Sequence, residues 1–521
     1  MNTHNERGMA IVLALFLMSI MTVLGASLMF LSQTETYATM NYRMMSQARY
    51  AAEAGIQRAG NFLLDPAQYT VPIGVTALAQ FDRTKSPIVC LTGCPNNDPK
   101  NPNHWVILSA TSAQPSNYPV STVQTAFNNA VQGTLTAGNG KLNYAAAATL
   151  IAMQAFDTFG GGQAVVQTWQ ITGTGSLSGG ARNATVEVVA TVETPKVPAM
   201  PYAAFATADI CGALDFNGNI DINSYDSTTI LGATAPTMAS SGGNVGTNGN
   251  LYLGGSANVD GNLYTPRTGV GTCAAGSVDA FTGNLTHVDS IVKLPAVVVY
   301  PTPVVPAWST LAATGPINSA AGACVKLGLT LGTNCFESGS NITVNGLGST
   351  LTLPSVTLGS STNLILVASS PPAQYNFNSI ELNGGSSIRI SATSPTQGVL
   401  VDVVGKTNTG AAIATPIDLV GGTFASVAGC ASCSNYDASM LQFIYAGTGE
   451  IKLTGNSGAA ATVYAPNAQV VLSGTQDLYG SVLGRTINNI GTGNIHYDRR
   501  LQHDFWVAGQ PMMGSFSWKR Y

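Results

Sequence analysis

Residues 9–31 read MAIVLALFLMSIMTVLGASLMFL and contain no charged side chain. A helix rises 1.5 Å per residue, so this stretch spans about 35 Å, more than the roughly 30 Å hydrocarbon core of a bilayer. A secretory signal peptide has a shorter apolar region followed by a small-residue cleavage site, whereas this run passes directly into further helical sequence. The stretch therefore predicts a transmembrane helix over residues 9–31 that stays on the protein as a membrane anchor.

The next segment, residues 32–64, extends the same helix. It has no proline before Pro66, so we predict one helix of about fifty residues whose second half lies outside the membrane. Small residues three or four apart let neighbouring backbones approach closely, which suits a helix that bundles with others. A single-span anchor with an amphipathic stalk is the alternative interpretation. The small residues are Ala48, Ala51, Ala52, Ala54, Gly55, Ala59 and Gly60.

The segment before the apolar run, MNTHNERG, ends in Arg7-Gly8 directly before Met9. It resembles the class III leader of type IV pilins and pseudopilins. With QARYAAEAGIQRA at residues 47–59, it makes the N-terminal region similar to the PilX-type N-terminal domain of pilus assembly proteins. The resemblance implies that prepilin peptidase cleaves between Gly8 and Met9. It also implies that the helix packs against other pilins or pseudopilins, inserted by inner-membrane assembly machinery.

One position departs from the pilin pattern. Major pilins carry a glutamate five residues after the cut, which is thought to pair with the N-terminal amine of the neighbouring subunit, and here that position is Leu13. An uncompensated carboxylate in a bilayer is costly, so leucine favours membrane residence but removes the charge pair that favours regular polymerisation. The resemblance therefore implies a minor, initiating or tip-located subunit, or an anchored relative that does not polymerise.

The overall composition is that of a β-rich chain outside the cytoplasm. Charged residues make up 9% of the 521 residues, against about 25% in an ordinary soluble domain, and 57 residues are glycine. With 45% hydrophobic residues and a net charge of −4, a disordered chain is excluded. The 21 Lys and Arg do not exceed the 25 Asp and Glu, so nucleic acid is a poor partner.

Residues 65–200 indicate a small α+β region. We expect helices in STVQTAFNNAVQ (121–132) and near YAAAATLIAMQAF (144–156). Residues 167–193 alternate apolar and polar side chains on either side of a Ser-Gly-Gly turn, which predicts a β-hairpin. Three prolines between residues 195 and 201 then mark a domain boundary.

Beyond the boundary the sequence consists of short β-type runs separated by Gly, Asn and Ser. Leu453 recurs as Leu472 and Val463 as Val482, an offset of about 19 residues. This period is typical of β-solenoid coils, and a β-sandwich is the competing interpretation. Residues 463–501 also resemble a C-terminal β-helical domain often joined to PilX-like N-termini.

We therefore expect an α+β fold with a mostly-β domain that forms a right-handed β-helix, with a β-sandwich as the alternative. The predicted parts are a leader (1–8), a transmembrane helix (9–31), its extracytoplasmic continuation (32–64), an α+β pilin-like region (65–200), a β-helix-like domain (201–500) with an insertion near 297–335, and a C-terminal tail (501–521).

The eight cysteines predict disulfides. An even number in a chain whose bulk follows a membrane helix indicates up to four bridges, and we expect sequential pairing. No thioredoxin-like pattern surrounds the single CxxC, and no His pair stands at zinc-ligand spacing, so redox catalysis and zinc binding are disfavoured. The expected pairs are Cys90/Cys94, Cys211/Cys273, Cys324/Cys335 and Cys430/Cys433.

Two polar clusters are weak metal candidates. Asp215, Asn217, Asn219, Asp221 and Asn223 alternate with other residues and would share one strand face, but the EF-hand pattern fails and a solvated Asn ladder is favoured. The second cluster would suit zinc or manganese, yet a polar cap that ends the solenoid is the preferred interpretation. It comprises His496, Asp498, His503 and Asp504.

No G-x-S-x-G, P-loop or HExxH motif is present, so the usual sequence supports for acyl transfer, nucleotide hydrolysis and zincin chemistry are missing. Asp402, Asp437 and Asp477 remain candidates for a solenoid carbohydrate enzyme.

We thus expect a non-catalytic minor pilin-like subunit without a cofactor, anchored in the bacterial inner membrane with its bulk in the periplasm or on the cell surface. The alternative is an anchored β-helical adhesin that binds glycans and does not polymerise. Recurrent tyrosines on the β runs would stack on sugars in that case, although cross-strand packing is the commoner explanation.

Overall fold

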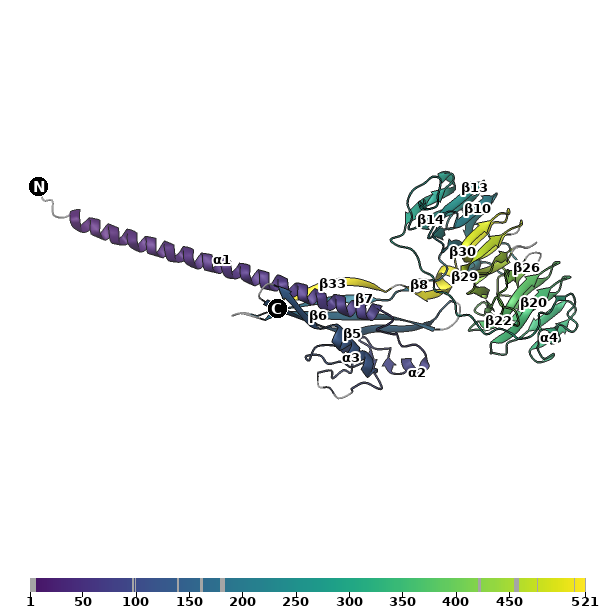
Figure 1. Ribbon diagram of the computed structural model, residues 1–521, viewed down its shortest axis with the longest axis horizontal. Coiled ribbons are helices and arrows are strands. Elements are labelled where there is room, and N and C mark those ends of the chain that lie inside the picture. Colours follow the sequence, from purple (N-terminus) through teal and green to yellow (C-terminus); the bar gives the residue numbers. More distant parts are fainter. Residues whose placement is uncertain are drawn as a thin grey trace. The chain divides into compact units, whose positions relative to one another are not determined.

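Figure 1 shows the computed structural model, which describes residues 6–95, 98, 100–137, 140–159, 163–178, 183–419, 423–453, 459–475, 477–509 and 511–520. The chain forms two compact units. Unit 1 comprises residues 1–157, 163–196 and 508–521, and unit 2 comprises residues 158–162 and 197–507.

Unit 1 is built around helix α1 (Glu6–Leu64), a single helix of 59 residues. The C-terminal part of α1 lies along an antiparallel sheet, and its N-terminal part extends beyond that sheet (Figure 1). The continuous helix predicted across residues 9–64 is therefore present.

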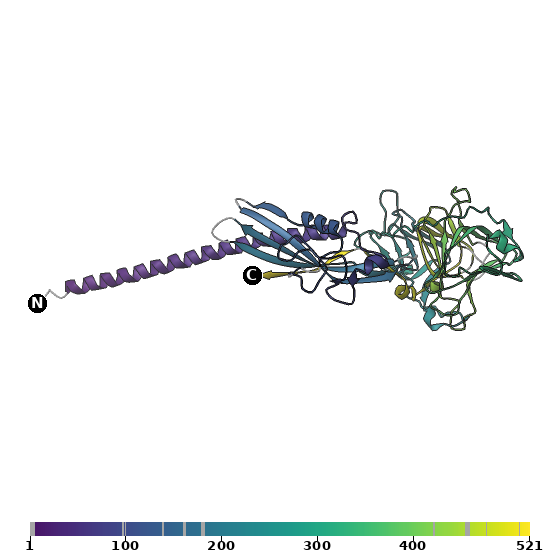
Figure 2. The ribbon, with the colours of Figure 1, turned by 90° about the horizontal axis from the view of Figure 1, so that it is seen from below.

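The sheet of unit 1 has the strand order β3-β5-β6-β7-β33, with β4 paired to β5. Figure 2 shows strands of this sheet lying along the C-terminal part of α1. Strands β6 and β7 form the predicted hairpin. The strands are β3 (Ile107–Ser109), β4 (Gly133–Ala137), β5 (Gly140–Asp157), β6 (Gln163–Ser178), β7 (Ala184–Glu193) and β33 (Met512–Arg520). Smaller elements are α2 (Val75–Leu78), β1 (Phe81–Asp82), β2 (Val89–Cys90) and α3 (Ser121–Ala130).

The helix predicted near residues 144–156 was wrong, because this segment is part of strand β5. The alanines of this segment suggested a helix because alanine has a high helix propensity, but here they serve close packing. Ala146 and Ala148 are fully buried in the same core cluster as Ala48 and Ala52 of α1, so they are small because a helix lies on them. The helix predicted over residues 121–132 is present as α3.

Part of the segment predicted as a C-terminal tail (501–521) belongs to the sheet of unit 1. Strand β33 pairs antiparallel with β7, with Met512 opposite Glu193 and Arg520 opposite Val186. Unit 2 is therefore inserted in the sequence between two adjacent strands of unit 1.

Unit 2 is mostly β, and its strands pair largely in parallel. One ladder joins β20, β22, β24, β27, β29 and β30 in sequence, and a second joins β19, β21, β23 and β26. Leu453 pairs with Leu472 and Val463 with Val482, so the 19-residue spacing seen in the sequence is the strand register.

The bounds of unit 2's elements, with the boundary strands β8 and β32, are β8 (Lys196–Pro198), β9 (Ala204–Ala206), β10 (Leu214–Gly218), β11 (Asp221–Tyr225), η1 (Ser227–Thr229), β12 (Val245–Thr247), β13 (Leu251–Gly255), β14 (Asn258–Thr265), β15 (Phe281–Thr282), η2 (Leu285–His287), β16 (Val288–Lys293), β17 (Pro316–Ile317), α4 (Ala323–Lys326), β18 (Cys335–Ser338), β19 (Asn341–Val344), β20 (Leu351–Leu358), β21 (Asn363–Val367), β22 (Ala373–Leu382), β23 (Ser387–Ser391), β24 (Val399–Val403), β25 (Ile417–Asp418), β26 (Thr423–Ala428), η3 (Ala438–Met440), β27 (Leu441–Tyr445), β28 (Ile451–Leu453), β29 (Ala459–Leu472), β30 (Leu478–Asn489), β31 (Ile495–Asp498), α5 (Leu501–Asp504) and β32 (Trp506–Ala508).

The first strands of unit 2 lie against its last strands. Strand β10 pairs with β13 on one side and with β30 on the other, and β11 pairs in the same way with β14 and β31. The first strands, β10 and β11, therefore lie in the middle of the ladder. The ladder continues on one side through β13 and β14 as far as β16, and the last strands, β30 and β31, complete it on the other side.

The proline-rich segment 294–315 connects these two halves. The Val298 amide donates to Asn248, the Tyr464 hydroxyl donates to the Pro301 carbonyl, and Ser309 exchanges hydrogen bonds with Asn378. These contacts fix a segment that has no strand partner of its own.

Candidate functional site

The N-terminal half of α1 is an exposed apolar surface. Every residue from Met9 to Arg43 is exposed in unit 1, including the large hydrophobic side chains between Met9 and Leu31. The Ser19 hydroxyl donates to the Leu15 carbonyl and the Thr22 hydroxyl to the Ser19 carbonyl, which satisfies these polar groups within the helix. Soluble proteins rarely expose so large an apolar surface, so this half of α1 requires lipid or other helices around it.

The C-terminal half of α1 is docked on the sheet through small residues. Ala48, Ala52 and Ala59 are fully buried. A Cβ atom at Gly175 of β6 would lie 2.5 Å from the amide nitrogen of Ala52 and closer still to the carbonyl oxygen of Ala48. Glycine is thus required at this point because the helix backbone touches the strand.

This contact corrects one interpretation of the sequence. The Ala and Gly residues between positions 48 and 60 suggested a surface for bundling with other helices, but several of them pack on the molecule's own sheet. The surface available for other helices is the segment from residue 9 to residue 43, which contains Met9 and Leu13. Gly8 lies within α1, and its exposure is not among the described features.

The cysteines form four disulfides: Cys90–Cys94, Cys211–Cys273, Cys324–Cys335 and Cys430–Cys433. Each disulfide joins two cysteines of the same unit. They pair sequentially and fasten loops rather than the long helix.

The first metal candidate is divided between two strands. Asp215 and Asn217 lie in β10 and Asp221 in β11, with Asn219 at the corner between them. Asn217, Asn219 and Asp221 are exposed, while burial raises the pKa of Asp215. Among the described residues no three His, Cys, Asp or Glu side chains gather closely enough to hold a metal ion.

The second metal candidate is a set of separate contacts. Nδ1 of His496 lies 2.6 Å from Oδ1 of Asn223, and Nε2 lies 3.3 Å from Oδ2 of Asp477. Asp498 is fully buried and accepts hydrogen bonds from the amides of Ser227 and Arg500. These contacts join β31 to the first turn of unit 2. His503 lies in α5, and the side chain of Asp504 is outside the described residues.

Burial raises the pKa of Asp498 to about 6, and the nearby Asp437 carboxylate adds to the shift. Asp437 in turn contacts the guanidinium of Arg500 at 2.5 Å. Asp498, Asp437 and Arg500 thus form a buried charge network between the first and last turns of unit 2. Such a network is stabilising only when all its members are present, because removing one leaves an uncompensated buried charge.

The three aspartates considered for carbohydrate chemistry have different local partners. Asp402 of β24 accepts a hydrogen bond from Gln374, and burial raises its pKa to about 6. Asp437 caps η3. Burial raises the pKa of Asp477, but hydrogen bonds from His496 and Asn494 outweigh this effect and the resulting pKa is below its ordinary value. Each aspartate therefore has a structural partner.

The tyrosines considered as sugar-stacking residues are mostly used internally. Tyr464 and Tyr497 are buried and donate to the carbonyls of Pro301 and Met200. Tyr479 packs against the rings of Tyr225 and Tyr436. Cross-strand and inter-loop packing accounts for these three side chains.

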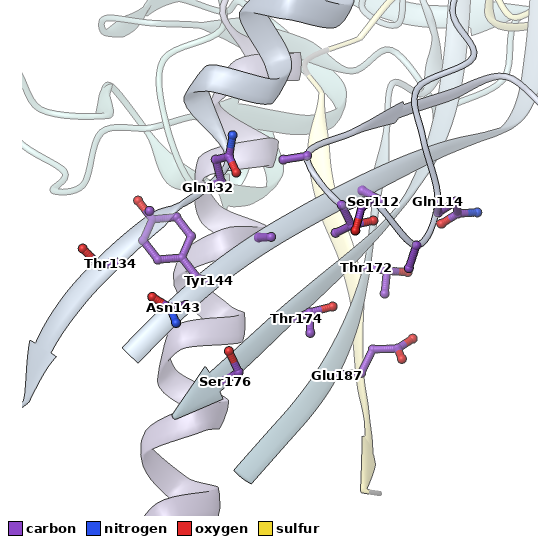
Figure 3. A pocket seen from close by; sticks show the side chains of 16 residues that line it. Ser112, Gln114, Gln132, Thr134, Asn143, Tyr144, Thr172, Thr174, Ser176 and Glu187 are labelled. Atoms are coloured by element: carbon purple, nitrogen blue, oxygen red, sulfur yellow. The ribbon is translucent and has the colours of Figure 1, made fainter. Parts of the chain in front are cut away.

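Sequence reasoning missed a polar trough in unit 1, on the sheet face opposite α1 (Figure 3). It has a volume of about 720 Å³. Thr172, Thr174 and Ser176 of β6 project into it, while Gly173 and Gly175 between them face the helix. The alternating stretch TGTGS at residues 172–176 is the sequence signal that could have revealed it.

An exposed apolar helical segment, continued by a small-residue segment docked on an antiparallel sheet, is a pilin-like arrangement. Residues 7–57 match the family described as PilX N-terminal, and residues 378–504 match a family described as a domain of unknown function, DUF7305. The N-terminal segment of the chain is thus PilX-like, and a second matched domain lies in its C-terminal part.

One solved structure similar to this chain is the crystal structure of the competence-associated pilin ComZ from Thermus thermophilus. The match covers 92% of this chain and 98% of that chain, with 14% sequence identity and a TM-score of 0.25. Comparison with curated proteins finds no match.

Proposed function

We propose that the protein is a non-catalytic minor subunit of a type IV pilus or pseudopilus, anchored in the inner membrane and inserted in the filament by α1. The observation that carries this proposal is the division of α1 at residue 43: the part before it, which includes the charge-free run 9–31, is exposed, and the small-residue part after it is docked on the sheet. An exposed segment of this length and composition fits both a bilayer and a bundle of similar helices.

In this proposal prepilin peptidase removes residues 1–8, and assembly machinery in the inner membrane transfers α1 from the bilayer to the filament. Leu13 lacks the carboxylate that would pair with a neighbouring N-terminus, which supports a minor or tip position over that of the main repeating subunit. Both units then lie outside the membrane, in the periplasm or on the cell surface.

For unit 2 we propose a right-handed β-helix. The parallel pairing of strands and the 19-residue register support this architecture, because the sandwiches considered as the alternative are built from antiparallel strands. A right-handed connection is the expected one between parallel strands of the same sheet.

Cross-linking from a single introduced cysteine tests insertion in the filament. The eight native cysteines are all paired, so Leu17→Cys adds one reactive thiol on the exposed half of α1. Val75→Cys is the matched control, because Val75 is exposed on unit 1 outside α1. We expect Leu17→Cys, but not Val75→Cys, to cross-link to other pilins in sheared filaments. Abundant membrane-bound protein with no such cross-link would favour an anchored adhesin that does not polymerise.

A further inference from the structure

We propose that the proline-rich segment 294–315 of unit 2 binds another protein, one that holds the segment in a groove lined by aromatic side chains with an acidic residue at one end. This inference goes beyond the filament role proposed above, which rests on α1. The segment reads LPAVVVYPTPVVPAWSTLAATG and contains no charged residue.

Burial along the middle of this segment repeats every third residue. One face is buried or half-buried, and the six residues that alternate with it in pairs are all exposed. A polyproline II helix has three residues per turn and rises about 3.1 Å per residue, so residues 300–309 match such a helix about 28 Å long. One face of it lies on unit 2, and the other two faces meet solvent. The residues of the inner face are Tyr300, Pro303, Pro306 and Ser309.

The backbone of the segment has the free polar groups of a polyproline II helix. In the part of the chain that the structure describes, no backbone amide of residues 299–308 has a hydrogen-bond acceptor. Such amides must be solvated or must bond to a partner, because an unpaired polar group is costly in lipid. A protein can supply acceptors for them, whereas a bilayer cannot. These amides therefore favour a protein over a lipid surface as the partner.

Hydrogen bonds at both ends hold the segment in place before any partner binds. The Val298 amide donates to Oδ1 of Asn248 at 2.8 Å. The Ser309 amide donates to Oδ1 of Asn378, also at 2.8 Å. A segment that is already ordered loses little conformational entropy on binding, which favours its use as a recognition element.

The two outer faces carry large apolar side chains. Val304 is 89% exposed on one of them, and Val299 and Val305 are exposed on the other. We call these exposed side chains of residues 299–308 the ridge. Proteins that recognise polyproline II segments receive such a ridge in a groove lined by aromatic side chains. The apolar outer faces and the free amides both fit this mode of recognition.

The charge beside the ridge indicates an acidic residue on the partner. The ammonium of Lys406 lies 4.6 Å from the centroid of the Trp308 ring, at the C-terminal end of the ridge. No carboxylate among the described residues lies within 4.0 Å of this ammonium. A carboxylate at one end of the partner's groove would therefore complement Lys406, and charge complementarity of this kind fixes the orientation of a bound segment.

Photo-cross-linking of the full chain, in permeabilised cells that produce it, tests the proposal. The photoreactive amino acid p-benzoylphenylalanine replaces Val304 in one variant and Val325 in the matched control. Val325 is 76% exposed in α4 of unit 2, outside the ridge. We expect a protein adduct from position 304 and none from position 325. An oligoproline peptide forms the same helix and should remove most of the adduct, whereas a flexible Gly/Ser peptide should not.

Reversal of one charge tests the acidic end of the groove. Lys406→Glu should lower the yield of the adduct from position 304 several-fold, because two carboxylates would then face each other. Lys326→Glu is the matched control, since Lys326 is exposed in α4 outside the ridge, and it should leave the yield unchanged. Unchanged thermal unfolding of Lys406→Glu would show that the loss is local. The oligoproline competition needs no such substitution.

Four results would overturn the proposal. They are no adduct from position 304, an adduct with lipid or with a second copy of this chain, a protein adduct that oligoproline does not reduce, and equal yields from Lys406→Glu and Lys326→Glu. None of these outcomes bears on filament insertion, which the Leu17→Cys experiment measures separately.

Discussion

Replacing Gly175 by alanine should undock α1 from its own sheet. An added Cβ would lie 2.5 Å from the amide nitrogen of Ala52, whereas ordinary contacts begin at about 3.4 Å, so the helix backbone must move by about 0.9 Å or more. The atoms met are backbone atoms of a helix, which cannot turn aside as a flexible side chain can. Overpacking costs about 1–3 kcal/mol, and we expect the upper end of this range.

For a domain of this size about 3 kcal/mol lowers the midpoint of thermal unfolding by roughly 6–12 °C. The assay is thermal unfolding of the detergent-solubilised full chain, followed by differential scanning calorimetry. Gly514→Ala is the control, because a Cβ there would lie 3.7 Å from the nearest atom, the carbonyl oxygen of Thr191. Equal midpoints for Gly175→Ala and Gly514→Ala would refute the argument that glycine at 175 is required by helix docking.

Three further predictions concern pH, disulfides and Leu13. Burial raises the pKa of Asp402 from 3.8 to about 6, so its contribution to the stability of unit 2 is fully present below pH 3.8 and is lost as pH rises through 6. The stability difference between the wild type and Asp402→Asn should therefore change by about 2 kcal/mol between pH 4 and pH 8 in denaturant titrations, and a pH-independent difference would contradict the assignment. Removing the Cys211–Cys273 bridge, which joins residues 62 apart, should lower the free energy of unfolding by about 4 kcal/mol. Removing Cys324–Cys335, with a separation of 11, should lower it by about 3 kcal/mol. If calorimetry of the two Cys→Ser double variants gives the reverse order, chain entropy is not the main effect. Leu13→Glu should raise the fraction of protein recovered in sheared filaments several-fold by restoring the charge pair with a neighbouring N-terminus, and an unchanged fraction would show that another contact limits polymerisation.

The sequence allowed prediction of those features that depend on neighbouring residues. The charge-free run and the absence of proline up to Pro66 predicted α1, and the alternation of residues 167–193 predicted the β6–β7 hairpin. The recurrence of Leu453 and Val463 predicted the strand register near the C-terminus. In each case the signal is a pattern of residues that lie close together in the sequence.

The features that escaped prediction depend on distant residues. The alanines of β5 look helical until α1 is seen to lie on them, because close packing selects the same small residues as helix propensity. Likewise, nothing around Leu214 or Ile487 indicates that β10 pairs with β30, or that β33 completes the sheet of unit 1 after the whole of unit 2. The trough was missed because its floor is assembled from three strands.

The division of α1 gives the small residues and the large apolar residues separate tasks. Ala48, Ala52 and Gly175 fix the helix to the sheet, while the segment from Met9 to Leu31 remains available to a bilayer or to other helices.

The most direct test of the pilin assignment is the N-terminal residue of the membrane-associated protein, determined by mass spectrometry in cells with and without prepilin peptidase. The account predicts a start at Met9 in the presence of the peptidase and at Met1 in its absence. A start at Met1 in both would contradict processing by the pilin pathway and leave α1 as the anchor of an ordinary membrane-bound surface protein.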